Sequence, residues 1–356
     1  MREAGMAALP GVRKIAVLRP SAIGDFMMAL PALHALRTTY PQAEIIYIGR
    51  QWHADFLNNR PAPIDRVVII PLYPGVGAPL ESMGNPLAIQ RFVDDMRAQK
   101  LDLAVQLYGG GRYSNPFIKQ LGARMTIGMR ASDAEPLDRW LAYGELQNRR
   151  LQMLAVTALV GADSVQIGAQ LQVTMRDRQE AQEVLDETQG KTLIVLQPGS
   201  TDRRRCWPPE RFAAVADQLT EQGALIAING SADEAMLVAQ VLECMRYPAL
   251  DLAGRLSLSG LCGLLEHADL LISNDTGPLH LALAIGTPAV GIYWLTNLIE
   301  FAPLRQDLHA AALSLRMQCP VCGVENLKTR CPHDVSFVDG VTVEEVMRLA
   351  IGFLKR

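Results

Sequence analysis

Three short segments of the 356-residue sequence combine glycine with hydroxyl or charged side chains, the residue types that bind phosphate-bearing ligands. The first is RPSAIGD, residues 19–25, where Gly24 lets a backbone approach a ligand and Asp25 supplies a carboxylate. That carboxylate is suited to general-base chemistry. It is equally suited to capping the next helix, because Asp is a favoured N-cap residue. The segment has neither the G-x-G-x-x-G pattern of dinucleotide sites nor the Gly-Lys-Ser/Thr of a P-loop.

The second segment is QPGSTDRRRCWP, residues 197–208. Its amides and hydroxyls can donate hydrogen bonds to phosphate oxygens, and an arginine can bind such oxygens through two parallel hydrogen bonds. Three adjacent arginines are also typical of a solvated loop. Trp207 favours a phosphate-binding loop instead, because an indole at this position anchors the loop to the protein.

The third segment is SNDTGPLH, residues 273–280. Asp275, Thr276 and Gly277 place a carboxylate, a hydroxyl and bare amides at the start of a helix, and His280 lies on its first turn. The alternative for His280 is a packed core residue. The Asp-Thr-Gly triplet does not indicate an aspartic protease, because the aspartic protease fold is entirely β and this segment joins a strand to a helix.

A fourth group of residues has the spacing of a metal site. Cys319 and Cys322 form a C-x-x-C pair, and Cys331 and His333 follow a few residues later. These side chains supply four ligands for a tetrahedral zinc or iron ion, whose role would be structural. The alternative is a set of reduced thiols packing a loop, because Cys and His one residue apart share an ion less readily than a wider pair.

Alternating strand and helix patterns position all four groups. Apolar, β-branched runs predict strands at 14–19, 44–48, 67–70, 101–107, 192–197, 224–229, 250–252, 270–273 and 289–293. Amphipathic or apolar helical patterns lie at 26–39, 87–99, 208–222, 233–244, 259–267, 279–284 and 343–354. Strands without polar alternation that alternate with helices indicate parallel sheets covered by helices on both faces.

The pattern weakens near residues 162–175 and then restarts, which predicts two doubly wound, Rossmann-like α/β domains. We place these domains at residues 1–165 and 176–340. Residues 341–356 contain a last helix that could pack on either domain. Residues 276–299 carry no charge, but their glycines and prolines favour a short helix and a buried strand over a membrane span.

Composition narrows the class of protein. Hydrophobic residues make up 49% and charged residues 20%, which excludes a disordered chain. There are 34 Lys and Arg residues against 37 Asp and Glu residues, a net charge of −3, so nucleic-acid binding is not expected. The first residues lack the apolar run of a secretory signal, so we expect a cytoplasmic protein without a disulfide framework.

Together the segments resemble glycosyltransferase family 9, the ADP-heptose:lipopolysaccharide heptosyltransferases. The similar stretches are VLRPSAIGDFMMALPALHALR, QPGSTDRRRCWPPERF and ADLLISNDTGPLHLALAIGTPAVGIY. The resemblance implies a GT-B fold, in which two Rossmann-like domains face each other across a cleft. It also implies that the C-terminal domain holds the nucleotide-sugar donor and the N-terminal domain the acceptor.

The resemblance also suggests roles for individual residues. Asp25 matches the family's general base, and Arg205 falls where the family carries a lysine against the donor diphosphate. Leu256 falls near the adenine, and Ser231 or Asp233 near the ribose. The candidate substrate-binding residues are Arg19, Ser21, Gly24, Gly199, Ser200, Thr201, Arg205, Asp233, Leu256, Asp275, Thr276, Gly277 and His280.

The implied activity is an inverting transfer of heptose from ADP-heptose to a lipopolysaccharide-core acceptor, with no cofactor required for catalysis. Alternatives are another nucleotide-sugar, a protein acceptor, or a non-catalytic sugar-nucleotide-binding protein. Residues 294–297, WLTN, depart from the family's usual turn near the donor sugar. A membrane-anchored acceptor would require peripheral contact with the inner membrane. Four arginines could make this contact: Arg60, Arg66, Arg149 and Arg150. The alternative is that they are scattered, solvated residues.

Overall fold

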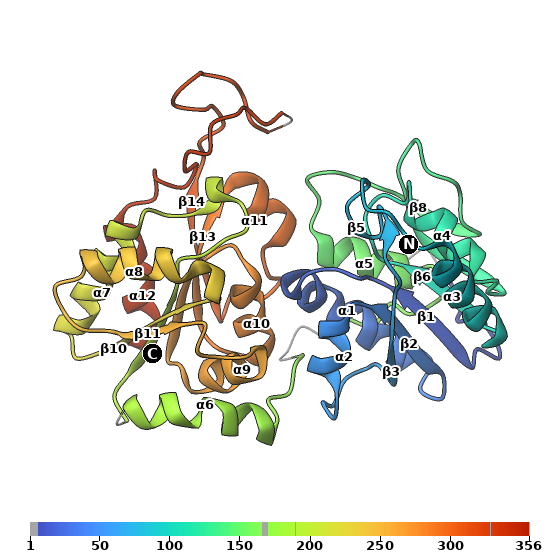
Figure 1. The fold of residues 1–356 in the computed structure, drawn as a ribbon, viewed down its shortest axis with the longest axis horizontal. Helices are drawn as coiled ribbons and strands as arrows, with labels where there is room; N and C mark the ends of the chain where they lie inside the picture. The colour runs from blue at the N-terminus through green and yellow to red at the C-terminus, as the bar shows by residue number, and fades with distance from the viewer. Residues whose placement is uncertain (1–5, 166–169, 189, 328, 356) are drawn as a thin grey trace, which may run out of the picture. The chain divides into compact units, whose positions relative to one another are not determined.

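The computed structural model describes the whole chain except residues 1–5, 166–169, 189, 328 and 356. The chain divides into two compact units, Met1–Gln170 and Leu171–Arg356. Each unit contains a parallel six-stranded sheet with helices packed against it, as Figure 1 shows. This arrangement confirms the predicted α/β class.

The sheet of the first unit has the strand order β3-β2-β1-β6-β7-β8. Its strands are β1 (Lys14–Leu18), β2 (Glu44–Gly49), β3 (Arg66–Ile69), β6 (Leu103–Gln106), β7 (Met125–Arg130) and β8 (Arg139–Ala142). The three central strands β2, β1 and β6 are almost entirely buried, which explains their unbroken apolar sequence. A small separate pair is formed by β4 (Tyr73–Pro74) and β5 (Gly77–Ala78).

The helices of the first unit are α1 (Ile23–Thr39), α2 (Gln51–Leu57), α3 (Pro86–Ala98), α4 (Ser114–Gln120) and α5 (Arg149–Ala158). Helix α1 is largely buried and packs against α5, which is why its sequence shows little amphipathic periodicity. Helix α3 instead buries one stripe, formed by Phe92, Val93 and Met96, against the sheet core.

The sheet of the second unit has the strand order β11-β10-β9-β12-β13-β14. Its strands are β9 (Leu193–Gln197), β10 (Leu225–Gly230), β11 (Leu250–Ala253), β12 (Leu270–Asn274), β13 (Ala289–Trp294) and β14 (His309–Ser314). The uncharged stretch 276–299 forms a short helix followed by the buried strand β13, as its glycines and prolines predict.

The helices of the second unit are α6 (Met175–Thr188), α7 (Pro209–Glu221), α8 (Ala235–Cys244), α9 (Leu258–His267), α10 (Gly277–Ile285), α11 (Leu295–Phe301) and α12 (Val343–Leu354), with short 3-10 helices η1 (Arg203–Arg205) and η2 (Ala232–Glu234). Helix α12 packs on α7 and on β12, β13 and β14, so it belongs to the second unit. Helix α6, which has no counterpart among the predicted helices, packs on α9.

In both sheets the first strand lies in the middle. The chain first builds the sheet toward one edge and then returns to build it toward the other edge. In the first unit β1 lies between β2 and β6, and in the second unit β9 lies between β10 and β12. Loops that leave the carboxyl ends of such neighbouring strands open a crevice, which is where ligands bind in open α/β sheets. The segments after β1, β9 and β12 are the three segments that the sequence marks for chemistry.

Candidate active site

In the first unit, Asp25 is the third residue of α1 and its carboxylate pairs with Arg19. The N-cap residue of α1 is Ala22, so Asp25 does not cap the helix. Arg19 donates to Oδ1 of Asp25 over 2.9 Å and to its backbone oxygen over 3.0 Å. The arginine side chain is 7% exposed and the carboxylate side chain 39% exposed. The pair therefore presents a fixed carboxylate at the protein surface.

Buried contacts hold Arg19 in place. Its guanidinium also donates to the backbone oxygen of Leu107, which directly follows β6. Tyr47 donates its hydroxyl to the backbone oxygen of Arg19 over 2.6 Å, and burial raises the pKa of this phenol so that it stays a donor. Ser21 is buried beside the pair, and its backbone oxygen accepts from the Trp52 indole over 3.2 Å.

The residues predicted for the site do not include a glycine-rich turn that follows Leu107, the residue whose backbone oxygen binds Arg19. Residues 109–111 are consecutive glycines just after β6, and Gly109 and Gly111 have positive φ angles of 62° and 95°. A side chain at Gly111 would start 2.4 Å from the amide nitrogen of Asn115. The turn thus brings bare backbone to the carboxyl end of β6 beside β1. Three glycines after a strand were the signal that could have identified it.

In the second unit, residues 198–206 form a loop after β9 that we call the arginine loop. Asp202 accepts a hydrogen bond from the backbone N–H of Arg204 over 3.1 Å and thereby caps η1. Trp207, which follows the loop, is fully buried. Its backbone N–H donates to Asn274 over 3.1 Å and its indole N–H to Val341 over 2.9 Å. These bonds confirm that the tryptophan anchors the loop.

Three predicted residues of the second unit, Arg205, Thr201 and His280, gather near the buried carboxylate of Asp275. Arg205 lies 3.4 Å from Oδ2 of Asp275 and also donates to the Thr201 hydroxyl over 3.1 Å. His280 Nε2 lies 3.2 Å from Oδ1 of the same carboxylate. Asn297, which the sequence did not single out, donates to Oδ2 over 2.9 Å. The cluster joins the segments that follow β9, β12 and β13, and Asn297 belongs to α11.

Several polar atoms of this region are buried without a hydrogen-bond partner. Within the described part of the chain they include Oγ of Ser200, Nε of Arg205 and Oδ1 of Asp275, although Oδ1 still faces His280. A buried polar atom without a partner costs roughly 1–3 kcal/mol, so proteins rarely leave one unless a ligand or water completes it. The donor hydroxyl and the guanidinium are therefore suited to an anionic ligand.

The remaining predicted residues occupy different positions around these loops. Thr276 is the N-cap residue of α10 but makes no capping bond through its hydroxyl, and Gly277 begins the helix. Asp233 is exposed and Leu256 is half-buried, on the loops after β10 and β11. The carboxylate of Glu234, missed in the sequence, lies where a side chain at Gly199 would stand.

Comparison with known proteins decides the family. The model of glycosyltransferase family 9 (heptosyltransferase) matches residues 89–328, about two thirds of the chain. The chain belongs to glycosyltransferase family 9. It is 24% identical over 295 residues to lipopolysaccharide heptosyltransferase 3 of Escherichia coli, covering 80% of this chain and 84% of the relative.

Solved structures share the fold of this family 9 glycosyltransferase. A family 9 glycosyl transferase from Veillonella parvula has a TM-score of 0.82 at 21% identity, covering 98% of this chain and 99% of the other. The E. coli ADP-heptose lps heptosyltransferase II has a TM-score of 0.74 at 20% identity, covering 96% and 98%. The protein therefore has the GT-B fold that the sequence predicts.

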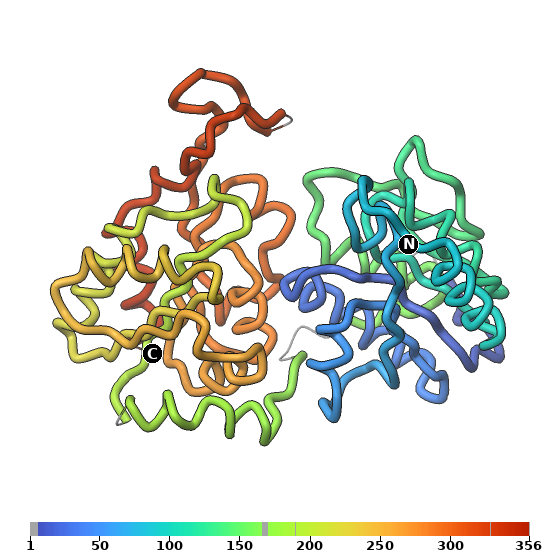
Figure 2. Tube along the Cα trace, in the orientation of Figure 1, coloured from blue at the N-terminus to red at the C-terminus, as the bar shows by residue number. Residues whose placement is uncertain are grey.

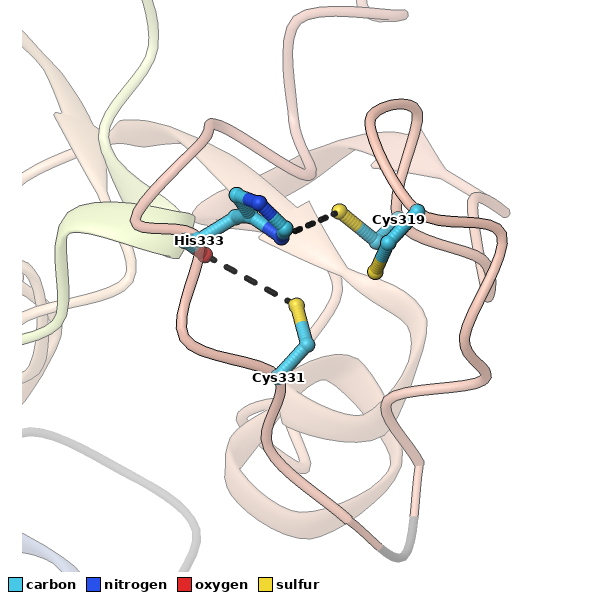
Figure 3. Close-up of side chains that lie close together, drawn as sticks. Cys319, Cys331 and His333 are labelled. Atoms are coloured by element: carbon cyan, nitrogen blue, oxygen red, sulfur yellow. Dashed lines mark hydrogen bonds between the residues drawn. The ribbon is translucent and has the colours of Figure 1, made fainter.

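The four predicted metal ligands of this glycosyltransferase lie together between β14 and α12. Their ligand atoms are all within 4.8 Å of one another, and Cys319 Sγ is 3.8 Å from His333 Nδ1. Figure 3 shows that Cys319, Cys331 and His333 point toward one another. A tetrahedral ion with metal–sulfur bonds of about 2.3 Å needs ligand separations of about 3.8 Å. The cluster thus fits a tetrahedral ion with shifts of about 1 Å or less.

The local backbone shapes this cluster and favours the ligating form of Cys331. Gly323, directly after Cys322, has a positive φ of 72° and donates its N–H to the backbone oxygen of Cys319 over 2.8 Å, which turns the C-x-x-C pair back on itself. A backbone hydrogen bond from His333 lowers the pKa of the Cys331 thiol to about 6. A thiol with that pKa is largely thiolate at neutral pH.

The prediction that four arginines contact a membrane needs a correction for two of them. Arg60 and Arg150 are buried, each only 7% exposed. Arg60 lies over the Phe56 ring, 4.1 Å from its centroid. The prediction that these two residues form a surface patch is wrong, because both side chains are buried. No helix among the described residues has the length and apolar character to cross a bilayer.

Proposed function

We propose that this glycosyltransferase transfers a heptose from ADP-heptose to a sugar of a lipopolysaccharide core. The observation that carries the proposal is the pair of unpartnered buried donors on the loop after β9, the Ser200 hydroxyl and Nε of Arg205, which are suited to the oxygens of a nucleoside diphosphate. Two comparisons support heptose as the sugar and ADP as the nucleotide of the proposed donor. Relatives are lipopolysaccharide heptosyltransferases, and a structural neighbour is an ADP-heptose enzyme.

The donor diphosphate would lie between the arginine loop and the N-terminus of α10. Ser200 and Thr201 would donate hydrogen bonds, while Arg205 and His280 would stabilise the negative charge that grows as ADP leaves. Backbone amides of the first turn of α10 would add donors at the positive end of the helix dipole. Asp275 would hold the arginine and the histidine in position through its two carboxylate oxygens.

The nucleoside would extend over the loops that follow β10 and β11. Asp233 or the neighbouring Glu234 would bind the ribose hydroxyls, and Leu256 would contact the adenine. The half-buried position of Leu256, which leaves part of its side chain accessible to a ligand, supports this placement.

The acceptor would be activated by Asp25. Its carboxylate would remove the proton of the acceptor hydroxyl while that oxygen attacks the anomeric carbon and ADP leaves from the opposite face, which inverts the configuration. General-base assistance of this kind is worth roughly 10²–10⁴ in rate. Arg19 would keep the carboxylate directed outward, and Ser21 and Gly24 would line the acceptor side.

We also propose that Cys319, Cys322, Cys331 and His333 hold one zinc or iron ion. The fit of their ligand atoms to a tetrahedron supports this site. Such an ion would crosslink the loop between β14 and α12, and no step of the transfer requires it.

A lipid-linked acceptor would bring the enzyme to the cytoplasmic face of the inner membrane. Of the four arginines considered for this contact, Arg66 and Arg149 are more exposed than the two buried ones, and Arg66 pairs with Glu44 over 2.5 Å. Peripheral contact would therefore use other parts of the surface as well. Cosedimentation with anionic vesicles measures it directly.

Two measurements test the donor and the reaction. A panel of nucleotides should raise the melting temperature most for ADP and ADP-heptose, because a ligand at a hundred times its Kd adds about 2.7 kcal/mol of stability. Release of ADP in the presence of ADP-heptose and a heptose-deficient lipopolysaccharide should then show transfer. A larger rise in melting temperature with UDP or GDP would overturn the assignment of ADP-heptose as the donor. Binding without turnover on lipid or protein acceptors would indicate a sugar-nucleotide-binding protein.

A further inference from the structure

The loop between β14 and α12 is long and irregular. Residues 315–342 contain no helix or strand apart from an isolated bridge between Gln318 and Glu325, with residue 328 outside the described part. Figures 1 and 2 show this segment projecting beyond the end of β14. A loop of this length without secondary structure needs another source of order, and such loops are usually functional or disordered.

One hydrogen bond closes the base of the loop, and another ties its outgoing arm to the end of β13. Ser314 donates its hydroxyl to the backbone oxygen of Phe337 over 2.5 Å, and the Trp294 indole donates to the backbone oxygen of Arg316 over 2.6 Å. The cysteine and histidine cluster lies farther along both arms of the loop. Cys319 belongs to the outgoing arm and Cys331 and His333 to the returning arm, so an ion there would add a crosslink between the two arms.

The returning arm touches the arginine loop on both sides of its two metal ligands. Before Cys331, the Arg330 guanidinium lies 4.0 Å from the Asp202 carboxylate. After His333, Ser336 donates its hydroxyl to the backbone oxygen of Cys206 over 2.7 Å, and Phe337 donates its N–H to that of Arg204 over 2.7 Å.

These contacts fall on the part of the arginine loop that sets the direction of Arg205. Asp202 caps η1, and the backbone groups of Arg204 and Cys206 flank Arg205 on either side. Arg205 in turn reaches Thr201 and Asp275 in the proposed diphosphate site. A chain of direct contacts therefore runs from the metal cluster to the donor site.

We infer that the metal centre is a brace for the donor site: an ion bound by the four side chains fixes the returning arm, which holds the arginine loop in its diphosphate-binding position. The inference rests on the proposed metal and donor. Metal binding and nucleotide binding are then coupled, so removal of the metal weakens ADP binding although the metal touches neither ADP nor sugar. Coupling between two sites is typically about 5- to 150-fold in affinity.

The test uses the full chain and a pair of matched variants. Cys322→Ser removes an exposed ligand, and Cys244→Ser removes an exposed thiol of α8 outside the cluster. Metal content is measured by elemental analysis of untagged protein, and ADP affinity by calorimetry. We expect Cys322→Ser to lose the metal and at least about fivefold in ADP affinity. We expect Cys244→Ser to match the wild type in both.

A second pair of measurements separates the brace from the metal itself. Ser336→Ala should keep the metal and still weaken ADP binding, because it breaks the contact between the returning arm and the arginine loop. Hydrogen exchange of residues 203–206 should speed up in Cys322→Ser and in Ser336→Ala, with or without nucleotide. Zn²⁺ or Fe²⁺ added back to chelator-treated wild type should restore both slow exchange and ADP affinity.

Each outcome bears on a different part of the inference. Unchanged ADP affinity and unchanged exchange in metal-free protein would overturn the brace. Wild-type protein with less than about a tenth of an equivalent of zinc or iron, and no uptake of either added ion, would overturn the metal site. Failure of wild-type protein to bind ADP would contradict the donor alone, because the exchange measurement still tests the brace.

Discussion

Replacement of Asp25 by Asn should stop transfer while the protein stays folded and binds nucleotide. The amide keeps the size of the carboxylate and can still accept the hydrogen bond from Arg19, but it cannot take a proton from an acceptor hydroxyl. Because general-base help is worth roughly 10²–10⁴, kcat should fall at least about a hundredfold, which corresponds to about 2.7 kcal/mol of barrier.

The expected effect on stability is small for this variant and larger for Asp25→Ala. The Asp25 side chain is 39% exposed, so the free energy of unfolding should change by about 1 kcal/mol or less in Asp25→Asn. Asp25→Ala leaves the 7% exposed guanidinium of Arg19 without that acceptor, which should cost about 1–3 kcal/mol. Two variants with similar inactivity and different stability would therefore separate chemistry from folding.

The assay measures ADP release at saturating ADP-heptose, together with the melting temperature with and without ADP. Asp25→Asn should show the wild-type shift with ADP, because the residues proposed to bind the nucleotide all lie in the second unit. If Asp25→Asn keeps more than about a tenth of wild-type kcat, the general-base assignment fails. If it loses the ADP shift as well, the carboxylate acts in binding or in folding.

Three further predictions concern stability. Desolvation lowers the pKa of the buried His53 to about 3, whereas the same histidine in the unfolded chain has a pKa near 6.5. Acid therefore protonates the unfolded chain first, and the free energy of unfolding should fall by about 2–3 kcal/mol between pH 7 and pH 4.5. Urea unfolding of His53→Gln should show that this part of the pH dependence is removed. Asn297→Ala removes a hydrogen bond to the buried carboxylate of Asp275 and should cost about 1.5–3 kcal/mol in urea unfolding. Gly199→Ala displaces the Glu234 carboxylate, which then loses its capping bond at η2, and should cost about 0.5–2 kcal/mol by thermal denaturation.

Each of these predictions has a control or an outcome that contradicts it. An unchanged pH slope in His53→Gln would mean that other groups govern acid stability. A cost below about 0.5 kcal/mol for Asn297→Ala would mean that its amide does not hold the carboxylate. Gly352→Ala is the control for Gly199→Ala, because Gly352 lies in α12 with open space around it and gains about 0.5–1 kcal/mol of helix propensity.

The central elements of the fold could be predicted because burial on both faces makes their sequences continuously apolar. The strands β1, β2, β9 and β12 were located to within a residue or so from such runs. Some of the missed elements are more exposed or more polar, although the missed strand β7 is largely buried. Strand β8 alternates half-buried and exposed residues at the sheet edge, and α6 is rich in charged side chains.

The site could be predicted only where local sequence carries the chemistry. Loops after β1, β9 and β12 contain their own glycines, hydroxyls and charges, so they were identified directly. Asn297 and Glu234 were not, because their importance comes from contacts with Asp275, 22 positions away, and with Gly199. Such contacts depend on which way neighbouring loops turn, and single-sequence patterns do not contain that direction.

The anchoring of Trp207 has a consequence for biosynthesis. Its indole N–H binds the backbone oxygen of Val341, a residue 134 positions later in the chain. At about 5–20 residues per second, a ribosome needs roughly 7 to 27 s to add that partner after it has made the tryptophan. During this interval the first unit can fold, while the tryptophan lacks one of the two hydrogen bonds that anchor the arginine loop at this end. We therefore expect nascent chains to acquire nucleotide affinity only when synthesis is nearly finished, so that prematurely terminated chains do not sequester the donor.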